Sequence, residues 1–271
     1  DCNPNVILAG FDIGANLAVT IAGAHMNIPI AHIQGGEVTG TIDESIRHAM
    51  SKFSHYHFAS NQDALERLVK MGEVRERIFD VGCPSIDAIL NTPDNPKILE
   101  KFNLTKNEFF ILLQHPVTSE MEESKRQIQI TLSAIKKSNV NTLIILPNND
   151  AGFSNIIREL KNSKIQFVES LGISDYINLL KRSLGLIGNS SSGIHETSTF
   201  NIPTINIGTR QNGRLRSKNI FDVDHDENQI IRAINKALEF KKNNIKVNNP
   251  YGDGNSAQRI LSILKTIDLS K

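Results

Sequence analysis

The sequence predicts an α/β protein built on two parallel sheets. Short apolar segments alternate along the chain with segments of helical character, and most of the apolar segments lack the polar alternation of a half-exposed strand. This pattern is typical of parallel strands that helices cover on both faces. One stretch rich in Pro, Asn and charged residues, at 91–109, divides the alternation into two series and is expected to be a linker. We therefore expect two Rossmann-like domains.

The first series contains four expected strands, each leading into a helix. Ser60 to Asp63 offer N-cap residues for the third helix, and Gly72 is expected to end it. The elements expected in order are a strand at 5–11, a helix at 16–26, a strand at 28–33, a helix at 43–52, a strand at 56–60, a helix at 64–72, and a strand, turn and helix over 77–90.

The second series has the same character and follows the linker. Its expected elements are a strand at 109–116, a helix at 120–138, a strand at 142–150, a helix at 153–162, a strand at 165–170, a helix at 174–182, a strand at 185–193, a helix to about 199, a strand at 203–210 and a charged helix at 226–243. The domain boundaries that follow are 1–91, 92–250 and a C-terminal helix in 251–271, which is expected to pack back on the first domain.

Composition excludes several classes of function. The net charge is +1, and no basic field points to nucleic acid or to a membrane surface. Trp is absent, which argues against stacking on bases. Cys2 and Cys83 are the only cysteines and have no metal-ligand spacing, so we expect no metal site and a reducing, cytoplasmic setting. No apolar run approaches the roughly 18 residues of a membrane helix.

Ligands of such sheets bind beyond the carboxyl ends of the strands, so the polar residues there are the candidates. "GNSSSGIHE" after the strand at 185–193 is the clearest signal for an anion, because glycines let the backbone approach a ligand and Ser190 and Ser191 lie where a helix should begin. The alternative is that these serines only cap the helix. A Walker loop and a G-x-G-x-x-G fingerprint are both absent.

Four further residues could complete an anion or sugar site. Arg210 offers a cationic fork for phosphate, or is a solvated surface side chain. Glu196 could bind sugar hydroxyls or pair with an Arg. His115 could donate to phosphate, move a proton, or be structural. Asn148 lies at the end of another strand of the same series.

Taken together, the motifs resemble those of the hydrolysing UDP-N-acetylglucosamine 2-epimerases of sialic acid biosynthesis. The resemblance runs in order over nearly the whole chain, through "NIPIAHIQGGEVTGTIDESIRHAMSKFSHYHF", "VGCPSIDAIL", "LLQHPVTSE", "LPNNDAG", "IGNSSSGIHE", "PTINIGTRQNGR" and "YGDGNSAQRIL". It implies a fold of glycosyltransferase-B type, with a UDP-sugar substrate held in a cleft, a homo-oligomer (dimer or tetramer), and neither cofactor nor essential metal.

The resemblance also implies a reaction. UDP is eliminated in the anti sense to give a 2-acetamidoglucal, and water then adds to the double bond to release a free sugar of N-acetylmannosamine type. Acid and base groups are needed on both sides of the sugar ring, which would explain the carboxylates around "HIQGGEVTGTIDE". The first domain would carry these groups, and the second would hold UDP. The adjacent glycines Gly35 and Gly36 would let the loop approach the sugar ring.

The catalytic acids that the resemblance implies fall on Asp12, position 34 and Asp43. Position 34 departs from the family, because Gln34 stands where a Glu is expected and an amide cannot act as a base. Either Glu37 takes over this role, or Gln34 only hydrogen-bonds the sugar. Ile13 is a second departure, at a position that is often Arg, and suggests another sugar, such as the 2,4-diacetamido-trideoxy substrate of legionaminic acid biosynthesis. Asp12 and Asp43 could alternatively be helix caps.

Family members also have about a hundred residues before the position of Asp1, so the first domain is expected to be incomplete. Two other functions remain open. One is a UDP-sugar-dependent glycosyltransferase of the same fold, which would need an acceptor. The other is a UDP-sugar-binding fragment without catalysis.

Overall fold

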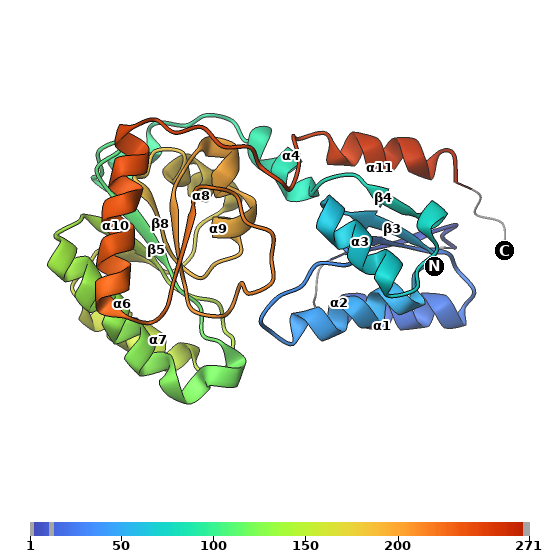
Figure 1. The fold of residues 1–271 in the computed structure, drawn as a ribbon, viewed down its shortest axis with the longest axis horizontal. Helices are drawn as coiled ribbons and strands as arrows, with labels where there is room; N and C mark the ends of the chain where they lie inside the picture. Colours follow the sequence, from blue (N-terminus) through green and yellow to red (C-terminus); the bar gives the residue numbers. More distant parts are fainter. Residues whose placement is uncertain (1–2, 11–13, 268–271) are drawn as a thin grey trace. The chain divides into compact units, whose positions relative to one another are not determined.

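The computed structural model describes residues 3–10 and 14–267, which form two compact units (Figure 1). Unit 1 comprises Asp1–Leu90, Asn212–Leu215 and Pro250–Lys271, and unit 2 comprises Asn91–Gln211 and Arg216–Asn249. Each unit contains one parallel sheet between helices, so the predicted α/β class is confirmed.

The sheet of unit 1 has four described strands in the order β1-β2-β3-β4. They are β1 (Ile7–Gly10), β2 (Ile30–Ile33), β3 (Tyr56–Ala59) and β4 (Ile78–Asp80). One face is covered by α1 (Gly14–His25), α2 (Asp43–Phe53) and α3 (Gln62–Lys70). On the other face lies α11 (Ser256–Leu264), which packs against α4 (Pro84–Leu90), and the short 3-10 helix η1 (Arg75–Arg77) precedes β4.

Alternate residues of the strands supply two cores in unit 1. Ile30 packs with Met50 of α2 on one face, whereas Phe58 packs with Val81 and Ile260 of α11 on the other. Helix α11 is also held at its N-terminus, because the carboxylate of Asp87 accepts hydrogen bonds from the backbone amides of Ser256 (3.0 Å) and Ala257 (2.7 Å). Two distant motifs, "CPSID" and "GNSAQ", thus meet through a helix cap.

The sheet of unit 2 has six strands in the order β10-β9-β8-β5-β6-β7. They are β5 (Phe110–Leu113), β6 (Thr142–Ile145), β7 (Phe167–Val168), β8 (Gly185–Gly188), β9 (Thr204–Ile207) and β10 (Ile220–Val223). Its principal core lies under α6 (Ser124–Ser138), α7 (Phe153–Asn162) and α10 (Glu227–Lys242). The remaining helices are α5 (Ile98–Lys101), α8 (Ile173–Leu180) and α9 (Ser192–His195), with 3-10 helices η2 (Thr118–Glu123) and η3 (Thr197–Phe200). Figure 1 shows α8 and α9 across the sheet from α6, α7 and α10.

The structure corrects two expectations. The stretch 91–109 is not a free linker, because it contains α5 and packs on unit 2. There the guanidinium of Arg182 donates to both carboxylate oxygens of Asp94 at 2.8 Å, and Asn178 accepts from the amide of Asn95. Strand β10 was not predicted, because its residues are half-exposed at the sheet edge and lack a fully apolar run.

No helix within residues 3–10 and 14–267 combines the length and the apolar character needed to cross a membrane.

Candidate active site

Three loops at the carboxyl edge of the unit 1 sheet meet through polar side chains. They follow β2, β3 and β4, and the parallel register brings their first residues together. Gln34 comes directly after β2 and has a left-handed backbone (φ 64°), which is uncommon for a residue other than glycine. Its amide continues the ladder to the carbonyl of Phe58, and its side-chain Nε2 donates to Sγ of Cys83 at 2.7 Å. Gln34 is therefore fixed to the loop after β4.

The two glycines after Gln34 are covered by protein atoms. A Cβ on Gly35 would lie 2.9 Å from Nδ1 of His32, and a Cβ on Gly36 (φ +81°) would lie 2.2 Å from the carbonyl oxygen of Ala64. The carbonyl of Gly36 accepts a hydrogen bond from Arg67 at 2.7 Å. These glycines were expected to let the loop approach a sugar, whereas the structure shows that they let it pack against α3 and His32.

Below this loop lies a pair of buried histidines. His32 and His57 are register partners on β2 and β3, and both are almost fully buried. Burial, assisted by the neighbouring His57 and Arg47, lowers the pKa of His32 to about 3. Burial also lowers the pKa of His57, against the opposing effect of Glu73 at 3.2 Å. The loop therefore rests on neutral imidazoles, and Nδ1 of His32 is 3.1 Å from the hydroxyl of Ser51.

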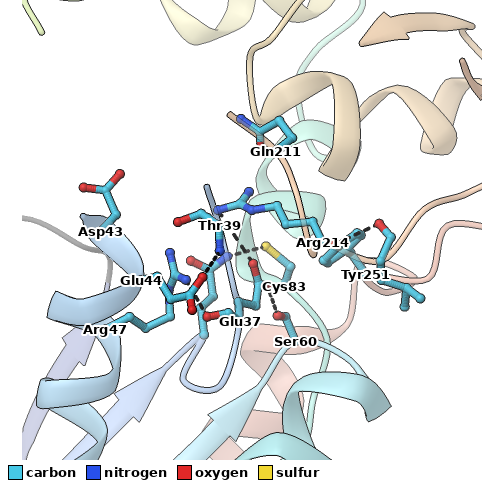
Figure 2. A network of polar contacts seen from close by, with 12 residues as sticks. Glu37, Thr39, Asp43, Glu44, Arg47, Ser60, Cys83, Gln211, Arg214 and Tyr251 are labelled. Atoms are coloured by element: carbon cyan, nitrogen blue, oxygen red, sulfur yellow. Dashed lines mark hydrogen bonds and ion pairs between the residues drawn. The ribbon is translucent and has the colours of Figure 1, made fainter. Parts of the chain in front are cut away.

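Glu37 is buried and held from three sides (Figure 2). The hydroxyl of Ser60 donates to Oε1 in a very short hydrogen bond, and Nη2 of Arg214 lies 3.9 Å from Oε2. The backbone carbonyl of Glu37 accepts from Nη1 of the buried Arg47 at 2.6 Å. These contacts place the carboxylate between one guanidinium and a hydroxyl donor, while a second guanidinium holds the backbone.

Asp43 lies apart from this group and does not take the alternative role of a helix cap. The N-cap position of α2 is Ile42, and no side chain caps the helix there. Asp43 is the first residue of α2, and its Oδ2 accepts from the hydroxyl of Thr41 at 3.1 Å. Figure 2 shows its carboxylate directed away from Glu37. The neighbouring Glu44 accepts from the amide of Thr39 at 2.8 Å, which holds the loop before the helix.

In unit 2, Asn189 ties three strand ends together. It follows β8, and its side chain exchanges two hydrogen bonds with the backbone of His115 after β5, at 2.7 and 2.9 Å. Its carbonyl accepts from Nη1 of Arg210 (3.3 Å) and from Nε2 of Gln211 (2.9 Å) in the loop after β9. An imidazole and a guanidinium are thereby held at the same edge of one sheet.

Arg210 is not a solvated surface residue, since only 14% of its side chain is exposed. Its Nη2 lies 3.9 Å from Oδ2 of Asp150. Asp150 also accepts from the side-chain amide of Asn148 (2.7 Å), which leaves the Asn148 oxygen 2.9 Å from Nδ1 of His115. Burial and the charge of Arg210 lower the pKa of His115 to about 4, so the ring is neutral at pH 7. Its Nδ1 faces Asn148 twice, because it also lies 3.2 Å from the backbone amide of that residue.

The serine motif after β8 is more enclosed than expected. Gly188 and Gly193 are required by packing within the unit, because a Cβ on Gly188 would lie 2.0 Å from the carbonyl of Leu113 and one on Gly193 2.7 Å from Thr204. Helix α9 has only four residues, and Ser191 at its N-cap position makes no side-chain cap. The hydroxyl of Ser190 accepts from the amide of Ser192 at 3.3 Å.

Glu196 lies at the end of α9, and Ser192 is its partner instead of an Arg. The hydroxyl of Ser192 donates to Oε2 at 2.6 Å and also makes a very short hydrogen bond with the hydroxyl of Tyr176. Burial raises the pKa of Glu196 above its ordinary value. Ser192 thus fixes the orientation of a carboxyl group whose proton is held more tightly than in water.

The sequence-predicted residues fall into two groups and one exception. Gln34, Glu37 and Asp43 lie on one loop and helix of unit 1. His115, Asn148, Ser190, Ser191, Glu196 and Arg210 lie at the carboxyl edge of the unit 2 sheet. Asp12, and Ile13 beside it, lie outside the described residues. Sequence reasoning missed the linking residues Cys83, Asn189, Gln211 and Arg214. Their positions in the sequence could have indicated them, because Cys83 and Asn189 follow predicted strands and Gln211 and Arg214 lie in the "RQNGR" motif.

Within the described parts of the chain, no cluster of three or more His, Cys, Asp or Glu side chains is arranged to hold a metal ion.

Comparison with known proteins decides the family. The family model for UDP-N-acetylglucosamine 2-epimerase matches residues 1–265. The chain belongs to this family. The match covers all of unit 2 and all of unit 1 except its last few residues. The members of the family are enzymes, and the predicted resemblance is confirmed.

Three relatives illustrate the similarity within the epimerase family. A UDP-N,N'-diacetylbacillosamine 2-epimerase (hydrolyzing) of Legionella pneumophila is 38% identical over 98% of this chain and 72% of its own length. A GDP/UDP-N,N'-diacetylbacillosamine 2-epimerase (hydrolyzing) of Campylobacter jejuni is 36% identical over 90% of this chain. A UDP-N-acetylglucosamine 2-epimerase of Neisseria meningitidis is 34% identical over 89% of this chain. The chain spans 66% of the length of each of the latter two.

A solved structure of this family shows the same fold. UDP-GlcNAc 2-epimerase from Neisseria meningitidis, bound to UDP-GlcNAc, matches with a TM-score of 0.84 at 19% identity, over 97% of this chain and 77% of that one. The fold is therefore of the predicted glycosyltransferase-B type.

Proposed function

We propose that this chain belongs to a hydrolysing 2-epimerase acting on a UDP-linked 2-acetamido sugar. The observation that carries the proposal is the junction at Asn189, which holds His115, Arg210 and Gln211 at the carboxyl edge of the unit 2 sheet. This is the edge at which parallel α/β sheets bind ligands, and a guanidinium there suits a diphosphate. Relatives named for this activity cover most of the chain.

Unit 1 would supply the acid–base groups. In the first step a base removes the proton from C2, the C–H electron pair forms the C1–C2 double bond, and the C1–O bond breaks with its electrons leaving on UDP. In the second step water adds its hydroxyl to C1, and C2 receives a proton from the opposite face. Asp43 is the described carboxylate best suited to one of these transfers, because it lies at the start of a helix and is not enclosed by cations.

The favoured sugar is a 2,4-diacetamido-trideoxy hexose, with N-acetylglucosamine second. Of the three relatives described above, the two with the higher identities, 38% and 36%, are named for the diacetamido sugar. A substrate with an acetamido group at C4 in place of a hydroxyl changes the donors and acceptors near the ring. Gln34, an amide where the resemblance implies a carboxylate, would suit such a change by hydrogen-bonding the sugar.

The reaction is tested by incubating the protein with each UDP-sugar in deuterated water, without an acceptor, and analysing the products by NMR. We expect free UDP and a free 2-epimerised sugar that carries deuterium at C2, because the proton added in the second step exchanges with solvent. A sugar that retains its original C2 hydrogen would exclude elimination followed by hydration. Release of UDP only on addition of an acceptor would indicate a glycosyltransferase. Binding of the UDP-sugar without turnover would indicate a non-catalytic protein.

The UDP site makes a separate prediction. Replacing Arg210 or Ser190 by Ala is expected to weaken UDP binding by about 1–3 kcal/mol, the range for hydrogen bonds that involve a charged group. Isothermal titration with UDP measures this loss. Arg158→Ala is the control, since it removes an exposed Arg from the middle of α7 in the same unit. Equal affinities for the Arg210 and Arg158 variants would remove Arg210 from the UDP site.

A further inference from the structure

A four-residue segment of the loop after β9 packs in unit 1. Asn212–Leu215 belongs to unit 1, whereas Gln211 before it and Arg216 after it belong to unit 2. Arg210 and Gln211 donate hydrogen bonds to Asn189 in unit 2, and the residues that follow them in the chain belong to unit 1. The backbone therefore connects the proposed UDP site to the residues of unit 1 that contact this segment.

Three successive residues anchor the segment within unit 1. Gly213 has a left-handed backbone (φ +80°), and a Cβ there would lie 2.6 Å from the side chain of Val38. The carbonyl of Leu215 accepts from the hydroxyl of the buried Tyr251 at 3.0 Å. Between them, the guanidinium of Arg214 faces the carboxylate of Glu37 at 3.9 Å, and Figure 2 shows the two side chains approaching from separate loops.

The Glu37–Arg214 pair is almost fully removed from solvent, with 4% and 8% of the two side chains exposed. A carboxylate buried this deeply needs compensation, which Arg214 supplies on one oxygen and the Ser60 hydroxyl on the other. Both oxygens thus face protein groups. Such a carboxylate is poorly placed to remove a proton from a substrate, whereas it is well placed to hold a loop.

We infer that Glu37 and Arg214 form a latch that couples the UDP site of unit 2 to the acid-bearing loop of unit 1. The inference rests on the proposed function. UDP at Arg210 would order the loop after β9, Arg214 would transmit that order to Glu37, and the backbone from Glu37 to Thr39 leads to Glu44 and Asp43 on α2. Both members of the pair are positioning residues and touch no substrate.

Hydrogen–deuterium exchange of the whole protein, with and without UDP, tests this coupling. In the natural protein UDP is expected to slow exchange in the peptide that spans residues 34–44. In Arg214→Met this protection should disappear, while UDP affinity by calorimetry changes by less than about twofold and kcat falls about tenfold, within the range of measured coupling effects. If Arg214 only stabilised the fold, its replacement would not abolish the UDP-induced protection of residues 34–44 while leaving UDP affinity unchanged.

Three further variants sharpen the test. Lys218→Met removes an exposed positive charge from the same loop outside the segment, and should behave as the natural protein. Arg214→Lys should restore protection in large part, because at 3.9 Å the contact is between charges and does not need the planar fork. Glu37→Gln should match Arg214→Met, and the double variant should be no worse than either single one.

The outcomes separate the latch from the proposed function. Intact protection of residues 34–44 in Arg214→Met, or additive losses in the double variant, would overturn the latch. Failure of UDP to bind the natural protein would contradict the proposed function. In that case the latch is tested by hydrogen–deuterium exchange of residues 212–215 in the protein without UDP. Arg214→Met and Glu37→Gln must both accelerate this exchange, and Lys218→Met must leave it unchanged.

Discussion

Replacing Asp43 by Asn is expected to lower turnover by roughly 10²–10⁴-fold, the usual effect of losing a positioned acid or base. UDP affinity should stay within about threefold, because Asp43 lies in unit 1 and the residues proposed to bind UDP lie in unit 2. Asn retains the size of the side chain and can still accept from Thr41. The loss would therefore report the missing proton transfer. The measurement is kcat from UDP release beside a calorimetric Kd for UDP.

Asp63→Asn is the matched control for Asp43. Asp63 is also in the first turn of a helix of unit 1, and its carboxylate pairs with Arg67 at the surface at 2.9 Å. It shares the favourable position at a helix N-terminus but has no part in the proposed chemistry. Wild-type kcat in Asp43→Asn, or equal losses in the two variants, would show that Asp43 acts only on helix stability.

The two alternatives for position 34 predict different results from further changes. If Glu37 were the base, Gln34→Glu would partly rescue Glu37→Gln, because the acid would return to a neighbouring position on the same loop. If Glu37 is part of the latch, Gln34→Glu cannot replace its contact with Arg214. It would also lose the amide donor that bonds Cys83. The contacts of Glu37 favour the second alternative.

The alternation of apolar strands and helices was enough to predict the fold class, because parallel strands buried on both faces leave an unbroken apolar signal. This apolar signal is weaker for the strands at the edges of a sheet. Strand β10 has no buried residue, and β7 was expected to be six residues long but has two, since an edge strand is paired on one side only. The stretch 91–109 has the composition of a linker, yet Arg182 and Asn178 fix it to unit 2 by contacts between residues far apart in sequence.

The candidate residues could be predicted because strand ends are identifiable from a single sequence, but their partners could not. Asn189 reads as one polar residue of a loop, and only the strand order β9-β8-β5 places His115 and Arg210 on either side of it. Arg214 and Glu37 lie 177 positions apart in the sequence (214 − 37), and no periodicity connects them. The glycines gave the least secure prediction, because a glycine that permits a ligand to approach and one that permits a helix to approach look the same in sequence.

Gly36→Ala is expected to destabilise the protein by about 2–5 kcal/mol. A left-handed backbone costs an L-residue about 1–2 kcal/mol, and overpacking a buried site costs about 1–3 kcal/mol more. Gly36 is buried with φ +81°, and the new Cβ would lie 2.2 Å from the Ala64 carbonyl and 2.9 Å from the Leu68 side chain. The carbonyl belongs to the first turn of α3, which Asn61 caps, so neither it nor the loop can move cheaply.

Gly72→Ala separates the two contributions in Gly36→Ala. Gly72 has nearly the same backbone (φ +88°), but it is exposed and a Cβ there would meet nothing within 4 Å. Urea unfolding should therefore show a loss of about 1–2 kcal/mol for Gly72→Ala, from the backbone alone. A clearly larger loss for Gly36→Ala would measure the close approach of the loop to α3. Equal losses would mean that the loop is free to withdraw from α3, which would favour the original expectation that these glycines serve a ligand.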